Sequence, residues 1–181
     1  MASDDAGRVK RVLLVGFMGS GKSTVGPELA ALLGWTFLDI DDVVAEAVGL
    51  PVPAIFSRHG EAFFRAREHE TTLGLLSRES VVLASGGGWP AAPGRLEDLD
   101  ARTASVWLDV PVDELLVRLE RSGGGRPLLD GPEAGRRARE LLERRAPFYG
   151  KATRTVDGGG TPMDVARRVL AALPGLATEA R

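Results

Sequence analysis

The sequence predicts an α/β fold in which a parallel sheet of about five strands is covered by helices on both faces. Short apolar runs typical of strands recur at residues 11–15, 36–39, 81–85, 104–109 and 153–157, and helical patterns fill the gaps between them. A glycine-rich motif typical of phosphate binding stands between the first strand and the first helix. The alternation indicates parallel strands, because these need a crossover connection that is usually a helix.

One domain is expected. A chain of 181 residues with 44% hydrophobic content can bury one sizeable core, and no linker divides it. We place the domain at residues 11–173. Residues 1–10 are polar and are expected to be a flexible lead-in, and residues 174–181 follow a Pro-Gly stop and are expected to be a flexible tail.

The first strand and helix enclose the pattern GxxxxGK[ST], with Gly16, Gly21, Lys22 and Ser23 at its defined positions. A chain with 23 glycines can match this pattern by chance in a simple turn. The context favours function, because an apolar run over residues 12–15 precedes the loop and apolar residues at helical spacing follow it.

This loop is expected to bind a nucleotide and Mg²⁺. Its backbone N–H groups would surround the phosphates, and the positive end of the following helix would face the anion. Lys22 would reach the β- and γ-phosphates, and the Ser23 hydroxyl would ligate Mg²⁺, which prefers oxygen. The residues that we assign to the nucleotide here are Gly19, Ser20, Gly21, Lys22, Ser23 and Thr24.

The second strand ends in carboxylates, in the run FLDID. Asp39 and Asp41 are two residues apart, so an extended backbone would point both to the same side, at the end of the sheet where ligands bind. One carboxylate can then serve the metal and the other the nucleophile. The alternative is that these acids, with Asp42, only cap the helix that follows.

A long amphipathic helix is predicted over residues 61–78, with Phe64, Leu73, Leu75 and Leu76 as core positions. The third strand follows it and leads directly into Gly86, Gly87 and Gly88. Three glycines after a buried strand indicate that another group approaches the backbone closely, although a loose turn is the alternative. We expect Trp89 beside them to pack rather than to bind a ligand.

The next helix is predicted at residues 112–121, and a stretch rich in glycine and proline follows at about 122–132. Its position between two helices predicts a mobile lid. Arg126 in this lid can bring a guanidinium over the phosphates, unless it is simply solvated.

Two further helices are predicted at residues 135–149, ending near Pro147, and at 161–173, with Thr161 as N-cap. Arg65 and Arg145 lie on helices crowded with charge, where solvated ion pairs would also explain them. We expect His59 and His69 at the surface, because they form no spaced ligand set.

Composition excludes several classes of protein. A net charge of −2 and a pI near 5.8 argue against nucleic acid or an anionic membrane surface as the main partner. The chain contains no cysteine, so disulfides and thiol catalysis are excluded. The N-terminus has no apolar signal region and no run of about 18 apolar residues occurs, so we expect a cytoplasmic protein. A GTPase would need a guanine-reading NKxD, which a chain without Asn cannot contain.

The runs GFMGSGKST, FLDID, GEAFFRAREHE, SGGG, GRPLL and RRAPFY stand in an order and spacing that resemble those of the shikimate kinases. The resemblance covers about residues 11–170. The first motif is shared by many nucleotide-binding proteins, but the combination is specific. It implies a P-loop fold like that of the nucleoside-monophosphate kinases. It also implies transfer of the γ-phosphate of ATP to the 3-hydroxyl of shikimate, in the route to chorismate and the aromatic amino acids.

The resemblance also implies a role for each matching residue. Lys22, Asp41 and Arg126 match catalytic residues, and Ser23 and Asp39 match metal ligands, the latter through water. Asp41, Arg65, Gly86, Gly87, Gly88 and Arg145 match the shikimate site, and Arg121 and Arg126 match nucleotide contacts, Arg121 by stacking on adenine. Two guanidiniums holding one carboxylate make chemical sense. We expect a monomer.

Two alternatives remain open. Gluconate kinase and related small-metabolite kinases share the phosphate-binding loop, although the pair Arg65 and Arg145 with the three glycines argues against gluconate. A nucleotide-binding regulator without catalytic activity belongs to a different class, and its function would survive loss of Asp41.

Overall fold

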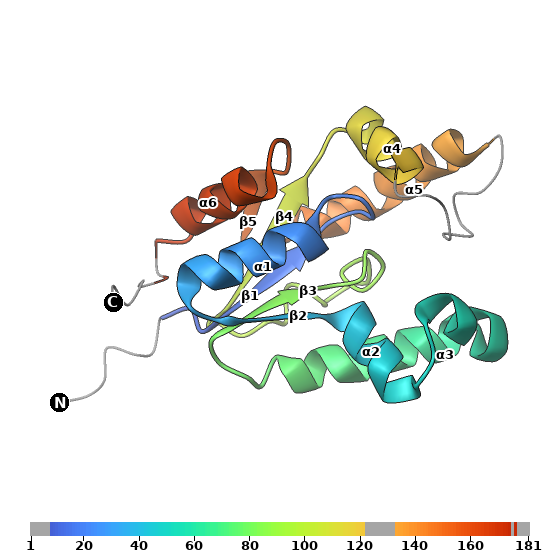
Figure 1. The fold of residues 1–181 in the computed structure, drawn as a ribbon, viewed down its shortest axis with the longest axis horizontal. Coiled ribbons are helices and arrows are strands. Elements are labelled where there is room, and N and C mark those ends of the chain that lie inside the picture. The colour runs from blue at the N-terminus through green and yellow to red at the C-terminus, as the bar shows by residue number, and fades with distance from the viewer. Residues whose placement is uncertain (1–7, 122–132, 175, 177–181) are drawn as a thin grey trace.

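The computed structural model describes residues 8–121, 133–174 and 176. In this part of the chain five strands form one sheet. They are β1 (Arg11–Val15), β2 (Thr36–Asp39), β3 (Val81–Ala84), β4 (Thr103–Asp109) and β5 (Arg154–Asp157). The helices are α1 (Lys22–Leu33), α2 (Ile40–Val48), α3 (Val52–Leu75), α4 (Val112–Arg121), α5 (Ala134–Tyr149) and α6 (Pro162–Ala172) (Figure 1). Each predicted strand is confirmed to within one residue at either end.

All the strand pairs are parallel, and the order across the sheet is β2-β3-β1-β4-β5. The central strand β1 pairs with β3 on one side and with β4 on the other, so that Leu13 lies opposite both Leu83 and Ser105. The carboxyl ends of all the strands therefore meet at one edge. From β1 the chain runs through α1 to β2 and β3 on one side, and it then crosses to β4 on the other side of β1. Such a change of direction is a topological switch point, and ligands bind at the carboxyl ends of the strands there.

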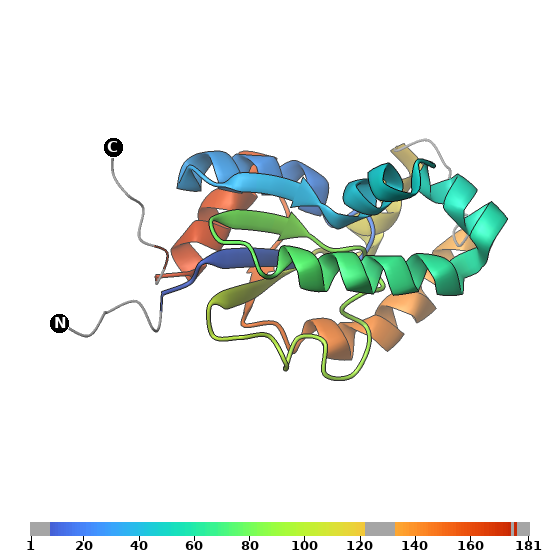
Figure 2. The ribbon, with the colours of Figure 1, turned by 90° about the horizontal axis from the view of Figure 1, so that it is seen from below.

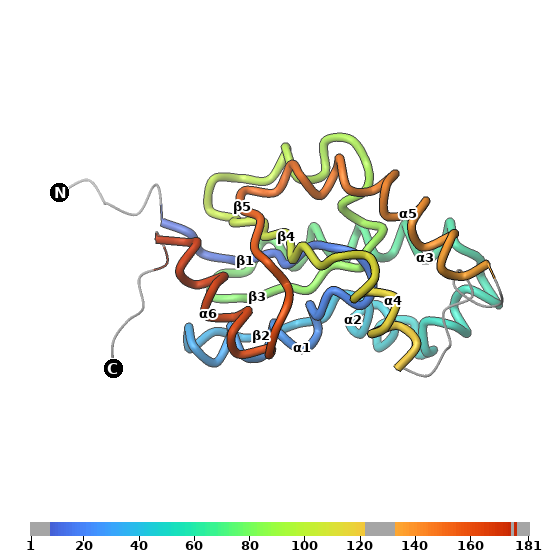
Figure 3. Tube along the Cα trace, turned by 90° about the horizontal axis from the view of Figure 1, so that it is seen from above, coloured from blue at the N-terminus to red at the C-terminus, as the bar shows by residue number. Residues whose placement is uncertain are grey.

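Helices cover both faces of the sheet, as predicted. Val12 and Leu14 of β1 belong to a buried cluster with α1 and α6. Leu13 and Val15, which point to the other face, belong to a cluster with α2 and α3. A third cluster joins α4 to α5 beyond the end of the sheet. Figures 2 and 3 both show α1 and α5 on opposite sides of the strands.

The long third helix differs from its prediction. It begins at Val52, not at residue 61, and its backbone breaks at Gly60, which has φ 82° and ψ 168°. The expected core residues Phe64 and Leu75 are buried and Leu76 is half-buried, but Leu73 is 54% exposed. The buried face runs through residues 64, 68, 72 and 75, at helical spacing, and Leu73 lies one step of about 100° away from it.

Both ends of the described chain contact the domain. The backbone N–H of Lys10 donates to the carbonyl of Arg102, and the Lys10 carbonyl accepts from Ser80. Leu176 is buried in the cluster that contains α1 and α6. These contacts do not measure flexibility, so the flexible lead-in up to residue 10 and the flexible tail from 174 stay predictions. Residues 1–7 and 177–181, and the predicted lid at 122–132, lie outside the described residues.

Proline is tolerated inside two helices. Pro27 lies in α1, and Pro147 lies near the end of α5, which continues past the predicted end to Tyr149. Without an N–H, Pro27 leaves the carbonyl of Ser23 without its helical donor. Ser23 is exposed, so water can satisfy that carbonyl. Among the described residues no helix combines the length and the apolar character that a membrane crossing needs.

Gly26 of α1 packs directly against the ring of Phe37 in β2. A Cβ built at residue 26 would lie 2.1 Å from Cε2 of Phe37. We expect Gly26→Ala to lower the free energy of unfolding by about 1–3 kcal/mol, because the Phe37 ring must move. Gly74→Ala is the matched control, since a Cβ there would meet nothing within 4 Å and alanine favours the helix. Urea unfolding of both variants tests this, and a Gly26→Ala protein as stable as Gly74→Ala would contradict it.

Candidate active site

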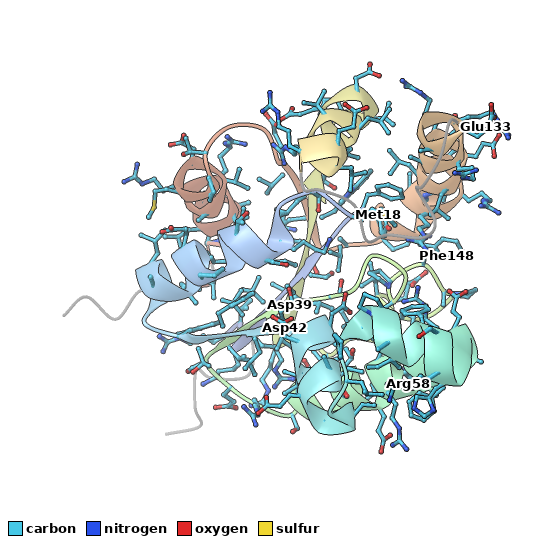
Figure 4. All side chains as sticks on the ribbon, turned by 45° about the vertical axis from the view of Figure 1, so that its right-hand side comes forward. Met18, Asp39, Asp42, Arg58, Glu133 and Phe148 are labelled. Atoms are coloured by element: carbon cyan, nitrogen blue, oxygen red, sulfur yellow. The ribbon has the colours of Figure 1, made fainter. Side chains whose placement is uncertain are left out.

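A cavity of about 880 Å³ opens at the carboxyl ends of the strands. Its walls come from the loop before α1, the start of α2, α3, the glycine loop after β3, α4 and α5. In Figure 4, Met18 lies on the loop before α1, and Asp39 and Asp42 lie together at the start of α2. The predicted site residues that line the cavity are Gly19, Ser20, Gly21, Lys22, Ser23, Thr24, Asp39, Asp41, Arg65, Gly86, Gly87, Gly88, Arg121 and Arg145. Arg126 lies outside the described residues.

The loop before α1 holds its lysine in place. Lys22 is buried, and its Nζ donates to the carbonyls of Gly16 at 3.0 Å and Phe17 at 2.9 Å. These bonds fix the ammonium at the first turn of α1, where the helix dipole also favours an anion. The loop is therefore shaped for phosphate by its own contacts.

Ser23 and Asp39 form a pair of oxygen ligands. The Ser23 hydroxyl donates to Oδ2 of Asp39 at 2.5 Å, while Oδ1 accepts the backbone N–H of Asp41 at 3.1 Å. The capping interpretation of Asp39 is therefore correct, and the same carboxylate still faces the phosphate loop. A hydroxyl and a carboxylate in contact beside a phosphate site can hold Mg²⁺, with water and phosphate oxygens completing its shell.

Asp41 reaches the cavity by a route that the sequence did not predict. The strand ends at Asp39, so Asp41 lies in the first turn of α2 and not on an extended backbone. Its Oδ1 is buried and has no hydrogen-bond partner among the described residues. Burial, and the nearby charges of Glu68 and Asp39, raise the pKa of Asp41 to about 6, although Lys22 and Arg65 act in the opposite direction.

Arg65 forms a partly buried ion pair. Its Nη1 lies 2.8 Å from Oε2 of Glu68, whose side chain is 1% exposed, and its Nη2 lies 3.3 Å from Oε1 of Glu61. The Arg65 side chain is itself 31% exposed and lines the cavity. The alternative of a purely solvated ion pair is therefore wrong, because Glu68 is withdrawn from water.

The glycine loop after β3 packs onto this ion pair. A Cβ built at Gly86 would lie 2.0 Å from Oε1 of Glu68, and one at Gly88 would lie 2.7 Å from Cζ of Arg65. Real side chains do not fit at those distances. The prediction that another group approaches these glycines closely is confirmed, and the loose turn is excluded.

Glu68 is a site residue that sequence reasoning missed. Its second oxygen, Oε1, is buried without a partner among the described residues, and burial raises its pKa despite the attraction of Arg65. A signal was present, because Glu68 occupies the same helical stripe as the buried Phe64, Thr72 and Leu75. A glutamate in an apolar stripe needs a cationic partner.

Arg145 lies on α5 and lines the cavity beside the glycine loop. A Cβ built at Gly87 would lie 3.6 Å from its Nη1. One turn later, the buried Tyr149 donates its hydroxyl to the carbonyl of Gly87 at 2.5 Å. Burial raises the pKa of Tyr149 to about 12, although Arg145 acts in the opposite direction, so the phenol remains a donor. Tyr149 thus fixes the glycine loop against α5.

The other end of the cavity is closed by a second missed residue, Arg118 of α4. Its guanidinium donates to the carbonyl of Gly19 at 3.4 Å, to Glu114 at 2.6 Å and to the carbonyl of Gly158 at 3.0 Å. It therefore joins the phosphate loop to the loop after β5. Arg121, one turn further along the helix, is exposed and also lines this end.

Trp89 and His69 lie outside the cavity. Trp89 is buried in the cluster with α2 and α3, which confirms that it packs. His59 is exposed as predicted, but His69 is half-buried, its Nδ1 is inaccessible, and its ring centroid lies 6.4 Å from that of Trp89. The surface assignment of His69 is therefore wrong.

Known proteins resemble this chain over most of its length. The sequence model of the family described as shikimate kinase matches residues 18–174. A shikimate kinase of Synechococcus sp. (strain RCC307) is 46% identical over 164 residues, which are 90% of this chain and 84% of that protein. One from Halorhodospira halophila is 43% identical and covers 91% of this chain and 94% of its own.

Solved structures agree with the sequence comparisons. The shikimate kinase from Acinetobacter baumannii in complex with shikimate has a TM-score of 0.83 and 38% identity, over 91% of this chain and 92% of that one. A gluconokinase from Sinorhizobium meliloti has a TM-score of 0.54 and 23% identity. The second likeness concerns the fold alone.

The cavity and the comparisons point to the same family. The P-loop lies at one end of the cavity, the Arg65 and Arg145 guanidiniums lie with the glycine loop at the other, and the family model matches residues 18–174. The chain belongs to the shikimate kinase family.

Proposed function

We propose that the protein transfers the γ-phosphate of ATP to the 3-hydroxyl of shikimate. The observation that carries this proposal is the order of groups along one cavity. Lys22 and its loop lie at one end, Arg65 and Arg145 line the other, and Asp41 lines the same space with an unpartnered oxygen. The related enzyme solved in complex with shikimate supports the same substrate.

Two guanidiniums suit a substrate carboxylate, because each can donate parallel hydrogen bonds to it. Glu68 holds Arg65 from behind, and Tyr149 fixes the loop between Arg65 and Arg145. The substrate carboxylate would therefore bind to groups that are already positioned, which reduces the conformational entropy lost on binding.

Asp41 is suited to the reacting hydroxyl. Its unpartnered Oδ1 can accept the hydroxyl hydrogen bond and orient the oxygen toward the phosphate end. With a pKa of about 6, it is mostly a carboxylate near neutral pH and can take up the proton as the new bond forms. At the phosphate end Lys22 stabilises the charge that develops on the transferred group.

We further propose Ser23 and Asp39 as the residues that hold Mg²⁺, which when bound neutralises phosphate charge and orients the phosphates. Arg121 and Arg126 are proposed nucleotide contacts, and Arg126 a catalytic residue, by resemblance to the family. A cytoplasmic location and a monomeric state are proposed from the sequence alone.

A coupled assay of ADP release with shikimate, ATP and Mg²⁺ tests the substrate. We expect saturable turnover that requires both substrates. Gluconate and a nucleoside monophosphate are the comparison acceptors, and turnover on either of them without turnover on shikimate would overturn the assignment.

Asp41→Asn keeps the size of the side chain and removes its charge. We expect kcat to fall by about 10²–10⁴, the usual contribution of a positioned acid or base, while ATP binding is retained. Isothermal titration with a non-hydrolysable ATP analogue measures the binding. Undiminished turnover in the variant would show that Asp41 does not serve the reacting hydroxyl, whereas ATP binding without turnover in the parent protein would favour the non-catalytic regulator.

The same variant should be more stable than the parent at alkaline pH. The pKa of Asp41 rises from an ordinary 3.8 to about 6 on folding, so its contribution to stability is full below 3.8 and is lost as the pH rises through 6. Asp41→Asn removes that loss. At pH 8 we therefore expect the free energy of unfolding of the variant to exceed that of the parent by about 1–3 kcal/mol, and its unfolding temperature to be higher. Scanning calorimetry without nucleotide or metal measures the gap. A gap as large at pH 5 as at pH 8 would show that titration of Asp41 is not its cause.

Arg65→Ala removes one of the two guanidiniums. We expect the KM for shikimate to rise by about 10–100-fold, as for loss of a charged hydrogen bond, with little change in the KM for ATP. Arg67→Ala is the matched control, because Arg67 is an exposed arginine on the same helix whose guanidinium contacts Glu70 and the ring of Phe63, outside the cavity. Equal losses for shikimate and ATP would mean that Arg65 does not bind the acceptor.

A further inference from the structure

Glu61 is a carboxylate at the acceptor end of the catalytic cavity. It lines the cavity together with Arg65 and Arg145, and its side chain is 62% exposed. The proposed reaction gives Glu61 no role. A carboxylate beside a site for an acidic acceptor needs an explanation, because like charges repel each other.

The break in α3 places Glu61 within reach of Arg65. The backbone is not helical at Gly60, so the helical turns that carry Arg65 begin at Glu61. The acid and the arginine are then four residues apart on one helix, with the acid nearer the N-terminus. This is the favourable order for such a pair, so the local sequence brings the two side chains together.

The Glu61 carboxylate takes one edge of the Arg65 guanidinium. Its Oε1 accepts from Nε and from Nη2 of Arg65, both at 3.3 Å. An arginine binds a carboxylate by two parallel hydrogen bonds along an edge of this kind. The contact is thus of the type that the carboxylate of an acceptor would make.

The other neighbours of the guanidinium are buried or packed. Nη1 lies 2.8 Å from Glu68, which is 1% exposed, and the ring of Phe64 lies 5.4 Å from Cζ. A Cβ built at Gly88 would lie 2.7 Å from Cζ and 2.8 Å from both Nη atoms, so Gly88 covers a face of the guanidinium and not an edge. Among these neighbours Glu61 is the exposed one, and water can hydrate it when it moves away.

Exchange of Glu61 for another carboxylate costs little. An exposed ion pair changes an equilibrium constant by a factor of about two to five, because water and salt screen it. The pair with Glu68 behaves differently, since separating it would leave a charge buried without compensation. Arg65 therefore has one partner that stays and one that can be replaced.

We propose that Glu61 is a displaceable counter-ion of Arg65, which the carboxylate of the acceptor replaces on binding. Glu61 lowers the affinity of this end of the cavity for carboxylates in general. An acceptor then has to make up the difference with contacts of its ring and hydroxyls, which makes Glu61 a residue that determines specificity. This inference rests on the proposed function, because it takes shikimate as the acceptor.

Calorimetric titration with shikimate at low ionic strength tests this role. We expect Glu61→Gln to lower the Kd for shikimate by about two- to fivefold, because the acid no longer competes with a charged partner of Arg65. Glu70→Gln is the matched control and should leave the Kd unchanged. Glu70 is 72% exposed, pairs with Arg67 on the same helix and does not line the catalytic cavity. Damage to the fold would weaken binding, so a tighter complex separates the proposal from a structural effect.

The Arg65→Ala background shows whether the gain depends on the guanidinium. There Glu61→Gln should no longer lower the KM for shikimate, because the group that Glu61 occupies is absent. An equal gain with and without Arg65 would mean that Glu61 acts on the acceptor directly, and would overturn the proposal.

The parent protein separates this inference from the proposed function. If the parent binds shikimate and Glu61→Gln binds it equally or more weakly, Glu61 is not a competitor and only this inference fails. If the parent neither binds nor phosphorylates shikimate, the proposed function fails and this inference fails with it.

Discussion

The buried ion pair between Arg65 and Glu68 is the interaction on which the acceptor end of the site depends. Removing one member of a buried pair leaves an uncompensated charge, which costs far more than a surface pair contributes. The buried carboxylate of Glu68 is compensated by the guanidinium of Arg65. The glycine loop covers this pair so closely that a Cβ would collide with Glu68 at Gly86 and with Arg65 at Gly88, which explains both glycines. The same glutamate raises the pKa of Asp41. One carboxylate on the buried face of α3 thus positions a guanidinium, restricts the composition of a loop and adds to the effect of burial on the pKa of Asp41.

The parallel sheet brings these groups to one edge. The carboxyl ends of β1, β2 and β3 lead into the phosphate loop, Asp39 and the glycine loop, so the strand register places all three beside one another. The arginines come instead from helices, Arg65 from α3 on one face of the sheet and the others from α4 and α5. The sheet therefore sets the position of the phosphate loop, while α3, α4 and α5 supply the groups that we propose distinguish the substrates.

Local sequence predicted the backbone well and the contacts between distant segments less well. The five strands, the phosphate loop and the cap at Asp39 follow from patterns within a few residues, and the structure agrees with them. Asp41 was assigned to the cavity for a wrong geometric reason, because an extended backbone and a first helical turn can both direct a carboxylate there. The pairs Arg65–Glu68 and Glu114–Arg118 are local. The loop glycines that Glu68, Tyr149 and Arg118 contact come from segments far apart in the chain, so no local pattern shows those contacts. Leu73 was misplaced because a run of leucines does not reveal which one lies on the buried stripe.

The break in α3 has a consequence for how acceptor specificity can change in evolution. Gly60 separates the turns that carry Val52 and Phe56 from those that carry Arg65, and all three residues line the catalytic cavity. A Cβ at Gly60 would meet nothing within 4 Å, so only its left-handed backbone, with φ 82°, resists substitution. The turns before this half-buried joint also carry Ile55, which is buried in the cluster with α2 and α3. A change of angle at Gly60 would therefore move one wall of the cavity relative to Arg65, and the core around Ile55 would have to repack with it.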